Sequence, residues 1–84
     1  MKHAGPQALA RLGPLLGELR ERKALLEKRP GVFYRRSRAF LHFHEDPTGL
    51  FADVRLAGDF SRHRVTTRAE QRTLLRAIDA ALDG

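Results

Sequence analysis

Two histidines and one aspartate have the types and the spacing that a small chemical site requires. His42 and His44 are separated by one residue, so in a β-strand their imidazoles share a face, about 6.6 Å apart. In one of two registers of a predicted hairpin, Asp53 lies directly opposite His42. Imidazole and carboxylate groups bind divalent ions such as Zn²⁺, and a His–Asp pair can transfer protons. The three residues therefore predict a metal or acid–base site, with an ordinary cross-strand contact of Asp53 with His42 or Arg64 as the alternative.

Aromatic and basic side chains are expected on the same sheet face as the two histidines. The candidate binding residues of this face are Phe33, Arg35, Phe40, His42, His44, Phe51, Asp53, Arg55, Arg62 and Arg64. Nucleobases stack on aromatic rings while guanidinium groups bind phosphates, so the face suits single-stranded nucleic acid or another polyanion. The three phenylalanines suit equally well an apolar patch that is buried in a homodimer. No glycine-aromatic RNA-binding motif decides between these partners.

An amphipathic helix is expected near the N-terminus. Leucines recur at helical spacing at positions 9, 12, 16, 19 and 26. Because Pro14 lacks a backbone N–H group, the well-formed helix is expected to start at Gly13 or Pro14, with proline in its first turn. The helix is expected to continue to residues 29–31, where Arg-Pro-Gly stops it. Residues 6–12 then form a separate turn or a kinked extension, and in one alternative residues 1–12 attach only loosely.

A second helix is expected at the C-terminus. Thr67 and Glu70 fit a capping box, in which a hydroxyl and a carboxylate each accept a hydrogen bond from a backbone N–H group. An apolar stripe follows at Leu74, Leu75, Ile78, Ala81 and Leu82, and Asp83-Gly84 is expected to end the helix.

Four strands are expected between the helices, at residues 32–34, 39–43, 50–56 and 60–65. The sequence Asp-Pro-Thr-Gly at positions 46–49 predicts the turn of a hairpin between the middle two. The result is one α+β domain over residues 1–84, with the N- and C-terminal helices packed on one face of a four-stranded antiparallel sheet, in the order α-β-β-β-β-α.

The register of this hairpin decides which side chains the helices bury. Pairing Glu45 with Leu50 places six apolar residues on the buried face: Leu41, Phe43, Leu50, Ala52, Val54 and Leu56. Pairing Asp46 with Leu50 would instead bury both histidines without partners, at a cost on the order of 1–3 kcal/mol each. We therefore favour the first register, in which a short turn at residues 36–37 also adds Val32 and Tyr34 to the buried face.

Composition limits the classes of function. The chain has 84 residues, no cysteine, and 16 Lys and Arg against 10 Asp and Glu, for a net charge of +6. Thiolate metal sites and disulfides are thereby excluded, and no apolar run approaches the ~20 residues that a membrane-spanning helix needs. We expect a cytoplasmic protein without a membrane partner. Its charge attracts anions, although an arginine-rich composition alone would give the same charge.

Three segments resemble a small bacterial family of unknown function that carries the label luciferase-domain family. They are residues 29–33 (RPGVF), 38–44 (RAFLHFH) and 49–55 (GLFADVR), within a stretch from 25 to 56. The resemblance implies a helix, a Pro-Gly entry to the first strand, and a His-x-His strand followed by a strand that carries Asp. It does not imply light emission, since no flavin or luciferin motif is present. More distantly, the chain is similar to small helix-sheet-helix proteins of the YjbR and frataxin-like kind, but it lacks the acidic ridge with which frataxins bind iron.

The sequence is interpreted as a non-enzymatic binding module that presents its open sheet face to a second copy of the chain or to an anionic ligand. Single-stranded nucleic-acid binding is one alternative. A metal-dependent or acid–base enzyme centred on His42, His44 and Asp53 is another. Of these interpretations, only a metal-dependent enzyme requires a cofactor, which is a divalent ion. No catalytic residue is assigned.

Overall fold

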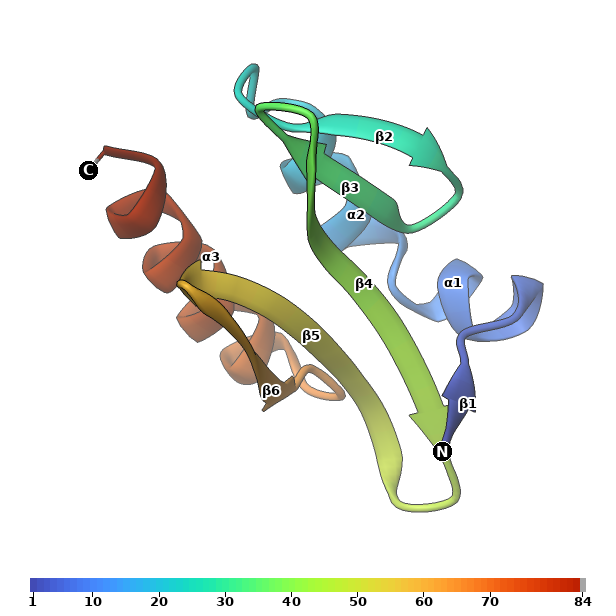
Figure 1. Cartoon of the computed structure of the whole chain (residues 1–84). Helices are drawn as coiled ribbons and strands as arrows, with labels where there is room; N and C mark the ends of the chain where they lie inside the picture. Colours follow the sequence, from blue (N-terminus) through green and yellow to red (C-terminus); the bar gives the residue numbers. More distant parts are fainter. Residues whose placement is uncertain (84) are drawn as a thin grey trace.

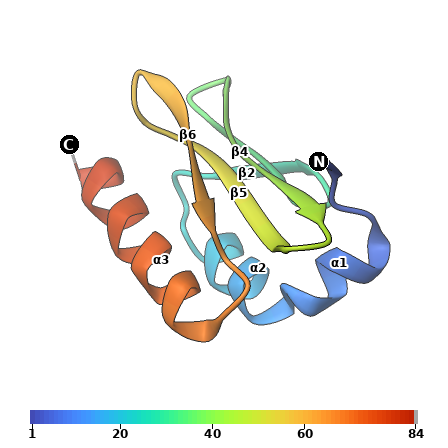
Figure 2. The ribbon, with the colours of Figure 1, turned by 90° about the horizontal axis from the view of Figure 1, so that it is seen from below.

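The computed structural model describes residues 1–83 as an antiparallel sheet with three helices on one of its faces (Figure 1). The helices are α1 (Pro6–Arg11), α2 (Gly13–Arg20) and α3 (Arg68–Asp83). The strands are β1 (Lys2–His3), β2 (Leu26–Arg29), β3 (Val32–Arg35), β4 (Arg38–Asp46), β5 (Gly49–Ala57) and β6 (Asp59–Arg64). Their order is β2-β3-β4-β5-β6, and β1 pairs with β4. Figure 2 shows that the helices leave the opposite sheet face, here called the open face, uncovered. The α+β class is confirmed, with six strands in place of the predicted four.

The hairpin of β4 and β5 has the predicted register. Glu45 pairs with Leu50, and His42 pairs with Asp53. The six apolar residues predicted to face the helices do so: five are almost completely buried, and Leu56 packs against them. The alternation of strand side chains therefore places the imidazoles of β4 on the open face.

An extra residue in β4 reverses the alternation between this hairpin and β3. Tyr34 pairs with Ala39, but Phe33 pairs with Leu41, so Phe40 has no partner of its own and forms a β-bulge. Phe40 and Leu41 are consequently both buried, and Phe33 is 1% exposed. The prediction that Phe33 and Phe40 lie on the open face is wrong for this reason.

The same bulge reverses the expected orientation of the other β3 side chains. Val32 and Tyr34, predicted to be buried, line a hollow together with His42 on the open face. Arg35, predicted on the open face, points like Phe33 to the helix side and donates a hydrogen bond to the carbonyl oxygen of Ala81 in α3 (3.2 Å).

The first long helix ends nine residues earlier than predicted. Helix α2 stops at Arg20, and residues 26–29, expected to be helical, form the edge strand β2. Residues 21–29 are good helix formers, but the pairing of residues 26–29 with β3 outweighs this local preference. Pro30 and Gly31 turn the chain from β2 into β3 and do not stop a helix. A side chain at Gly31 would lie 2.7 Å from Leu9, and the φ of Gly31 is +77°, so the turn requires glycine.

The N-terminal segment is joined to the rest of the molecule. Strand β1 continues along the edge of β4 where β3 ends, with His3 paired to His44. The backbone N–H of Gly5 donates to the Glu45 carboxylate (2.7 Å), and Leu12 is fully buried beside α2. Among residues 1–83, no helix has the length and apolar character needed to cross a membrane.

The C-terminal helix begins as predicted. The Thr67 hydroxyl accepts from the Glu70 N–H (3.1 Å), and the Glu70 carboxylate accepts from the Thr67 N–H (3.0 Å). Leu74 and Ile78 of α3 pack into the core. The predicted end of this helix includes Gly84, which lies outside the described residues.

The two-residue loop between β3 and β4 is strained. Arg36 and Ser37 have φ values of +52° and +66°, and Arg35 pairs with Arg38 on either side of them. This is the backbone pattern of a type I′ turn, in which Asn and Gly are the favoured residues. Side chains with a Cβ atom are destabilising in this region.

Replacing Ser37 with glycine should therefore stabilise the protein. We expect Ser37→Gly to raise the free energy of unfolding by about 1 kcal/mol, since the relief of strain exceeds the added entropy of the unfolded chain. Urea unfolding of both proteins measures the change. A lower midpoint for the variant would contradict the described loop conformation.

The placement of Phe40 in the core and of Phe60 on the surface predicts losses of stability of different size for the two phenylalanines. Phe40→Ala should lower the free energy of unfolding by about 3–5 kcal/mol because it empties a buried site. Phe60 is 39% exposed, so Phe60→Ala should cost about 1 kcal/mol or less. Thermal and urea unfolding test the contrast, and equal losses would contradict the placement of Phe40 in the core.

Candidate functional site

Asp53 organises the polar centre of the open face. Arg62 on β6 donates two hydrogen bonds to it, from Nε to Oδ1 (2.7 Å) and from Nη2 to Oδ2 (2.8 Å). From β4, the Nε2 atoms of His44 and His42 lie 3.1 and 3.5 Å from the same Oδ2. The carboxylate therefore joins three strands through one network of charged and polar groups.

The surroundings of the two ring nitrogens of His44 indicate which of them carries its proton. Its Nδ1 atom is buried and has no hydrogen-bond partner among residues 1–83. A proton there would be a buried donor without an acceptor, whereas Nε2 lies 3.1 Å from Oδ2 of Asp53, so the surroundings favour the tautomer in which Nε2 carries the proton.

This arrangement bears on the predicted metal site. His42, His44 and Asp53 each offer one ligand atom within 4.8 Å of the others, close enough to approach one ion. However, the Nε2 lone pair of His44 is used by its proton, and Arg62 binds both oxygens of Asp53. The residues fit a divalent ion poorly while this network is intact, and metal binding at this position stays a prediction.

The network also shifts two pKa values. Burial lowers the pKa of His42, and the nearby His44, His3 and Arg62 act in the same direction, while Asp53 opposes them. The hydrogen bonds from Arg62 lower the pKa of Asp53, further aided by the charge of Arg62 and by the two histidines of β4. Asp53 is thus an anion at neutral pH and His42 is mainly neutral.

Aromatic rings form a row across the open face. His3 stacks on His44 with ring centres 4.7 Å apart, His44 meets His42 at 5.0 Å, and His42 meets Phe60 at 5.3 Å. Beside this row lies a hollow of about 410 Å³, here called the ring hollow, whose lining includes His3, Tyr34 and His42. The row and the hollow offer several aromatic surfaces on one face of the sheet.

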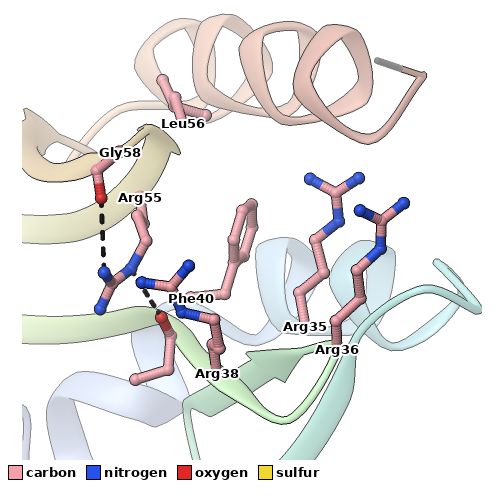
Figure 3. A pocket seen from close by; sticks show the side chains of 8 residues that line it. Arg35, Arg36, Arg38, Phe40, Arg55, Leu56 and Gly58 are labelled. Carbon is pink, nitrogen blue, oxygen red and sulfur yellow. Dashed lines mark hydrogen bonds between the residues drawn. The ribbon is translucent and has the colours of Figure 1, made fainter.

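Four arginines surround a second hollow of about 200 Å³ at the end of the sheet. They are Arg35, Arg36, Arg38 and Arg55, and we call this the arginine hollow. Figure 3 shows Arg35 and Arg36 extending in the same direction on one side of Phe40, with Arg38 and Arg55 on the other. Arg55 is held in place by a hydrogen bond from Nε to the Ala39 carbonyl oxygen (3.1 Å).

None of the four arginines of this hollow forms an ion pair within residues 1–83. Within residues 1–83, the arginines that pair with carboxylates are Arg20, Arg22, Arg62 and Arg64. Arg35 is only partly balanced, by the carbonyl end of α3. Positive charge is therefore concentrated, without carboxylates, at one end of the sheet.

The structure brings together part of the predicted binding face. The residues found on the open face are His42, His44, Phe51, Asp53, Arg55, Arg62 and Arg64. Arg62 and Arg64 are held by Asp53 and Glu70, whereas the guanidinium of Arg55 lies 4.5 Å above the Phe60 ring. Whether these side chains bind a ligand stays a prediction.

Sequence reasoning missed other members of the site. Phe60 precedes Arg62 by two residues, so period-two alternation could have placed it on the open face. Arg36 and Arg38 lie in and directly after the predicted turn, within a basic run that has no acidic residue, and could have been assigned to the site on that ground. His3 has no sequence signal, because only the pairing of β1 with β4 brings it to the other histidines.

Comparisons of the chain with protein-family models, with curated proteins and with solved structures gave no match. The resemblance to the luciferase-domain family, and the more distant one to YjbR and frataxin-like proteins, therefore stay predictions. Function has to be argued from the two hollows and the network between the strands.

The lowered pKa of His42 predicts a pH dependence of stability. Because its pKa in the folded protein is below the ordinary 6.5, the unfolded chain binds this proton first as the pH falls. The stabilising contribution is present above pH 6.5 and is lost as the pH falls below it. Urea unfolding between pH 7.5 and 5 should show a decrease that is smaller in His42→Asn, because the variant lacks the ring whose pKa burial lowers, aided by His44, His3 and Arg62 and opposed by Asp53. Identical slopes for both proteins would contradict this account.

Proposed function

We propose that this protein is a non-enzymatic module that binds an anionic ligand in the arginine hollow. The observation that carries the proposal is the gathering of Arg35, Arg36, Arg38 and Arg55 around one hollow, with no ion-pair partner for any of them within residues 1–83. Clustered like charges repel one another, and an anion that sits between them relieves this repulsion.

The chemistry of arginine favours oxyanions as the ligand. A guanidinium group presents five N–H donors in a planar fork, which matches the oxygens of a phosphate or carboxylate. Two backbone carbonyls, of Ala39 and Gly58, already orient the Arg55 guanidinium. A pre-oriented donor loses less conformational entropy when a ligand binds.

The strained loop supports the same proposal. Arg36 occupies a backbone conformation that favours glycine or asparagine, and local strain often accompanies a functional requirement. Placing a basic side chain beside the hollow is such a requirement.

The homodimer alternative has less support than the sequence suggested. It rested on an apolar patch of three phenylalanines, and two of these, Phe33 and Phe40, are in the core. Phe51 is partly buried, and the exposed Phe60 is covered in part by Arg55. Self-association stays a prediction, and the polar character of the open face favours a charged ligand.

Removing two hollow arginines should weaken anion binding. We expect Arg36→Ser with Arg38→Ser to lower the affinity for inorganic polyphosphate on the order of tenfold or more, because each loses charge-assisted hydrogen bonds. Isothermal titration calorimetry at two salt concentrations measures the affinity, which should fall as salt rises.

The matched control removes the same charge elsewhere. Arg11 and Arg76 are exposed on α1 and α3, so Arg11→Ser with Arg76→Ser changes the net charge equally but leaves the hollow intact. Equal losses in both double variants would show a nonspecific effect of net charge, and the absence of any polyphosphate binding would refute the proposal.

A further inference from the structure

We infer that the anionic ligand is a single-stranded nucleic acid, with a phosphate in the arginine hollow and a base in the ring hollow. This inference rests on the proposed function and adds to it the chemical class of the ligand. It depends on how the two hollows lie relative to each other.

The two hollows are adjacent. Ala39 lines both of them. Arg55 connects the two kinds of surface, since its Nε atom binds the Ala39 carbonyl oxygen and its guanidinium lies over the Phe60 ring. Arginines that can bind a phosphate and rings that can stack on a base therefore lie side by side, as the phosphate and the base do in a nucleotide.

The lining of the ring hollow suits a base. His3, His42 and Tyr34 are among the residues that line it, and bases stack on aromatic rings without the need for a defined sequence. The row continues beyond the hollow, because the edge of His42 contacts Phe60. A second base can therefore follow the first along the open face.

Charge is also present on the other side of the ring hollow. Arg29 lines the hollow and pairs with Val32, at the end of β3 opposite to Arg35. Lys28 lies beside it, with Nζ 4.3 Å from the centre of the Tyr34 ring. Neither is in an ion pair within residues 1–83. A nucleobase in the ring hollow thus has positively charged side chains on both sides. This matches a polynucleotide, in which each nucleotide has a phosphate on either side.

A double helix does not fit this arrangement. Its bases are stacked on each other and present only their edges, so their faces cannot reach the rings of the open face. The arrangement therefore selects single strands over duplexes.

The test distinguishes binding of the base from binding of the phosphate. A labelled single-stranded oligonucleotide is titrated by fluorescence anisotropy at pH 8, where an ordinary imidazole is uncharged, and polyphosphate, a duplex of equal length and a mononucleotide serve as competitors. We expect Phe60→Ala and His3→Ala each to lower oligonucleotide affinity on the order of tenfold, as stacking on one ring contributes. The affinity of His3→Ala for polyphosphate should equal that of the wild type. Phe60→Ala removes the ring beneath Arg55, so its loss of affinity for the oligonucleotide should exceed any loss for polyphosphate.

His63→Ala is the matched control for the loss of an imidazole. His63 lies on β6, where its Nε2 atom is 2.8 Å from the Ser61 hydroxyl, and it is not part of the ring row. This variant should keep the wild-type affinity for both ligands.

The outcomes distinguish this inference from the proposed function. If Phe60→Ala and His3→Ala leave oligonucleotide binding unchanged while Arg36→Ser with Arg38→Ser weakens it, the hollow binds anions and the inference about bases is refuted. Equal competition by the duplex, or by the mononucleotide, also refutes it. If neither polyphosphate nor the oligonucleotide binds, the proposed function fails as well.

Discussion

The single extra residue in β4 determines what each face of the sheet presents. Because Phe40 has no partner on β3, Phe33 and Phe40 turn toward the helices and complete the core, while Tyr34 turns outward to the histidines. A regular pairing would instead have left an apolar open face, with a strong tendency to associate. The bulge also leaves the small residue Ala39 between the two hollows. One local irregularity thus fixes both the packing of the core and the chemistry of the surface.

The carboxylates of the chain are used mainly to hold the fold together. Asp79 of α3 binds Arg22 through two hydrogen bonds and fixes the segment after α2. Glu70 caps α3 and also binds Arg64, and Asp53 ties β6 to β4. The net charge of +6 is therefore not spread evenly. It is partly neutralised where the elements join, whereas the four arginines at the end of the sheet where β3 meets β4 have no ion pair within residues 1–83.

The sequence predicts the parts of the structure that local rules determine. The hairpin register follows from the cost of burying His42 and His44, and the start of α3 follows from Thr67 and Glu70. The bulge could not be predicted, since residues 39–41 are three consecutive apolar residues that do not fix which of them face the helices, and only packing against Phe33 decides the outcome. Strand β2 was missed because its pairing with β3 is a tertiary interaction that overrides helix-forming residues. The acid–base network around Asp53 was predicted in part, without Arg62 as its main partner.

Strand β1 is a part of the sheet that can detach while the rest of the molecule stays folded. It has only two residues, and few backbone hydrogen bonds hold it to β4, among them Ala4 N–H to the Phe43 carbonyl (3.0 Å). Short terminal segments of this kind detach at a small free-energy cost while the core stays folded. The position of the His3 imidazole on the open face therefore depends on the equilibrium between attached and detached β1. If β1 detaches, His44 loses the ring that stacks on it, and the part of β4 that β1 covers becomes an unpaired edge.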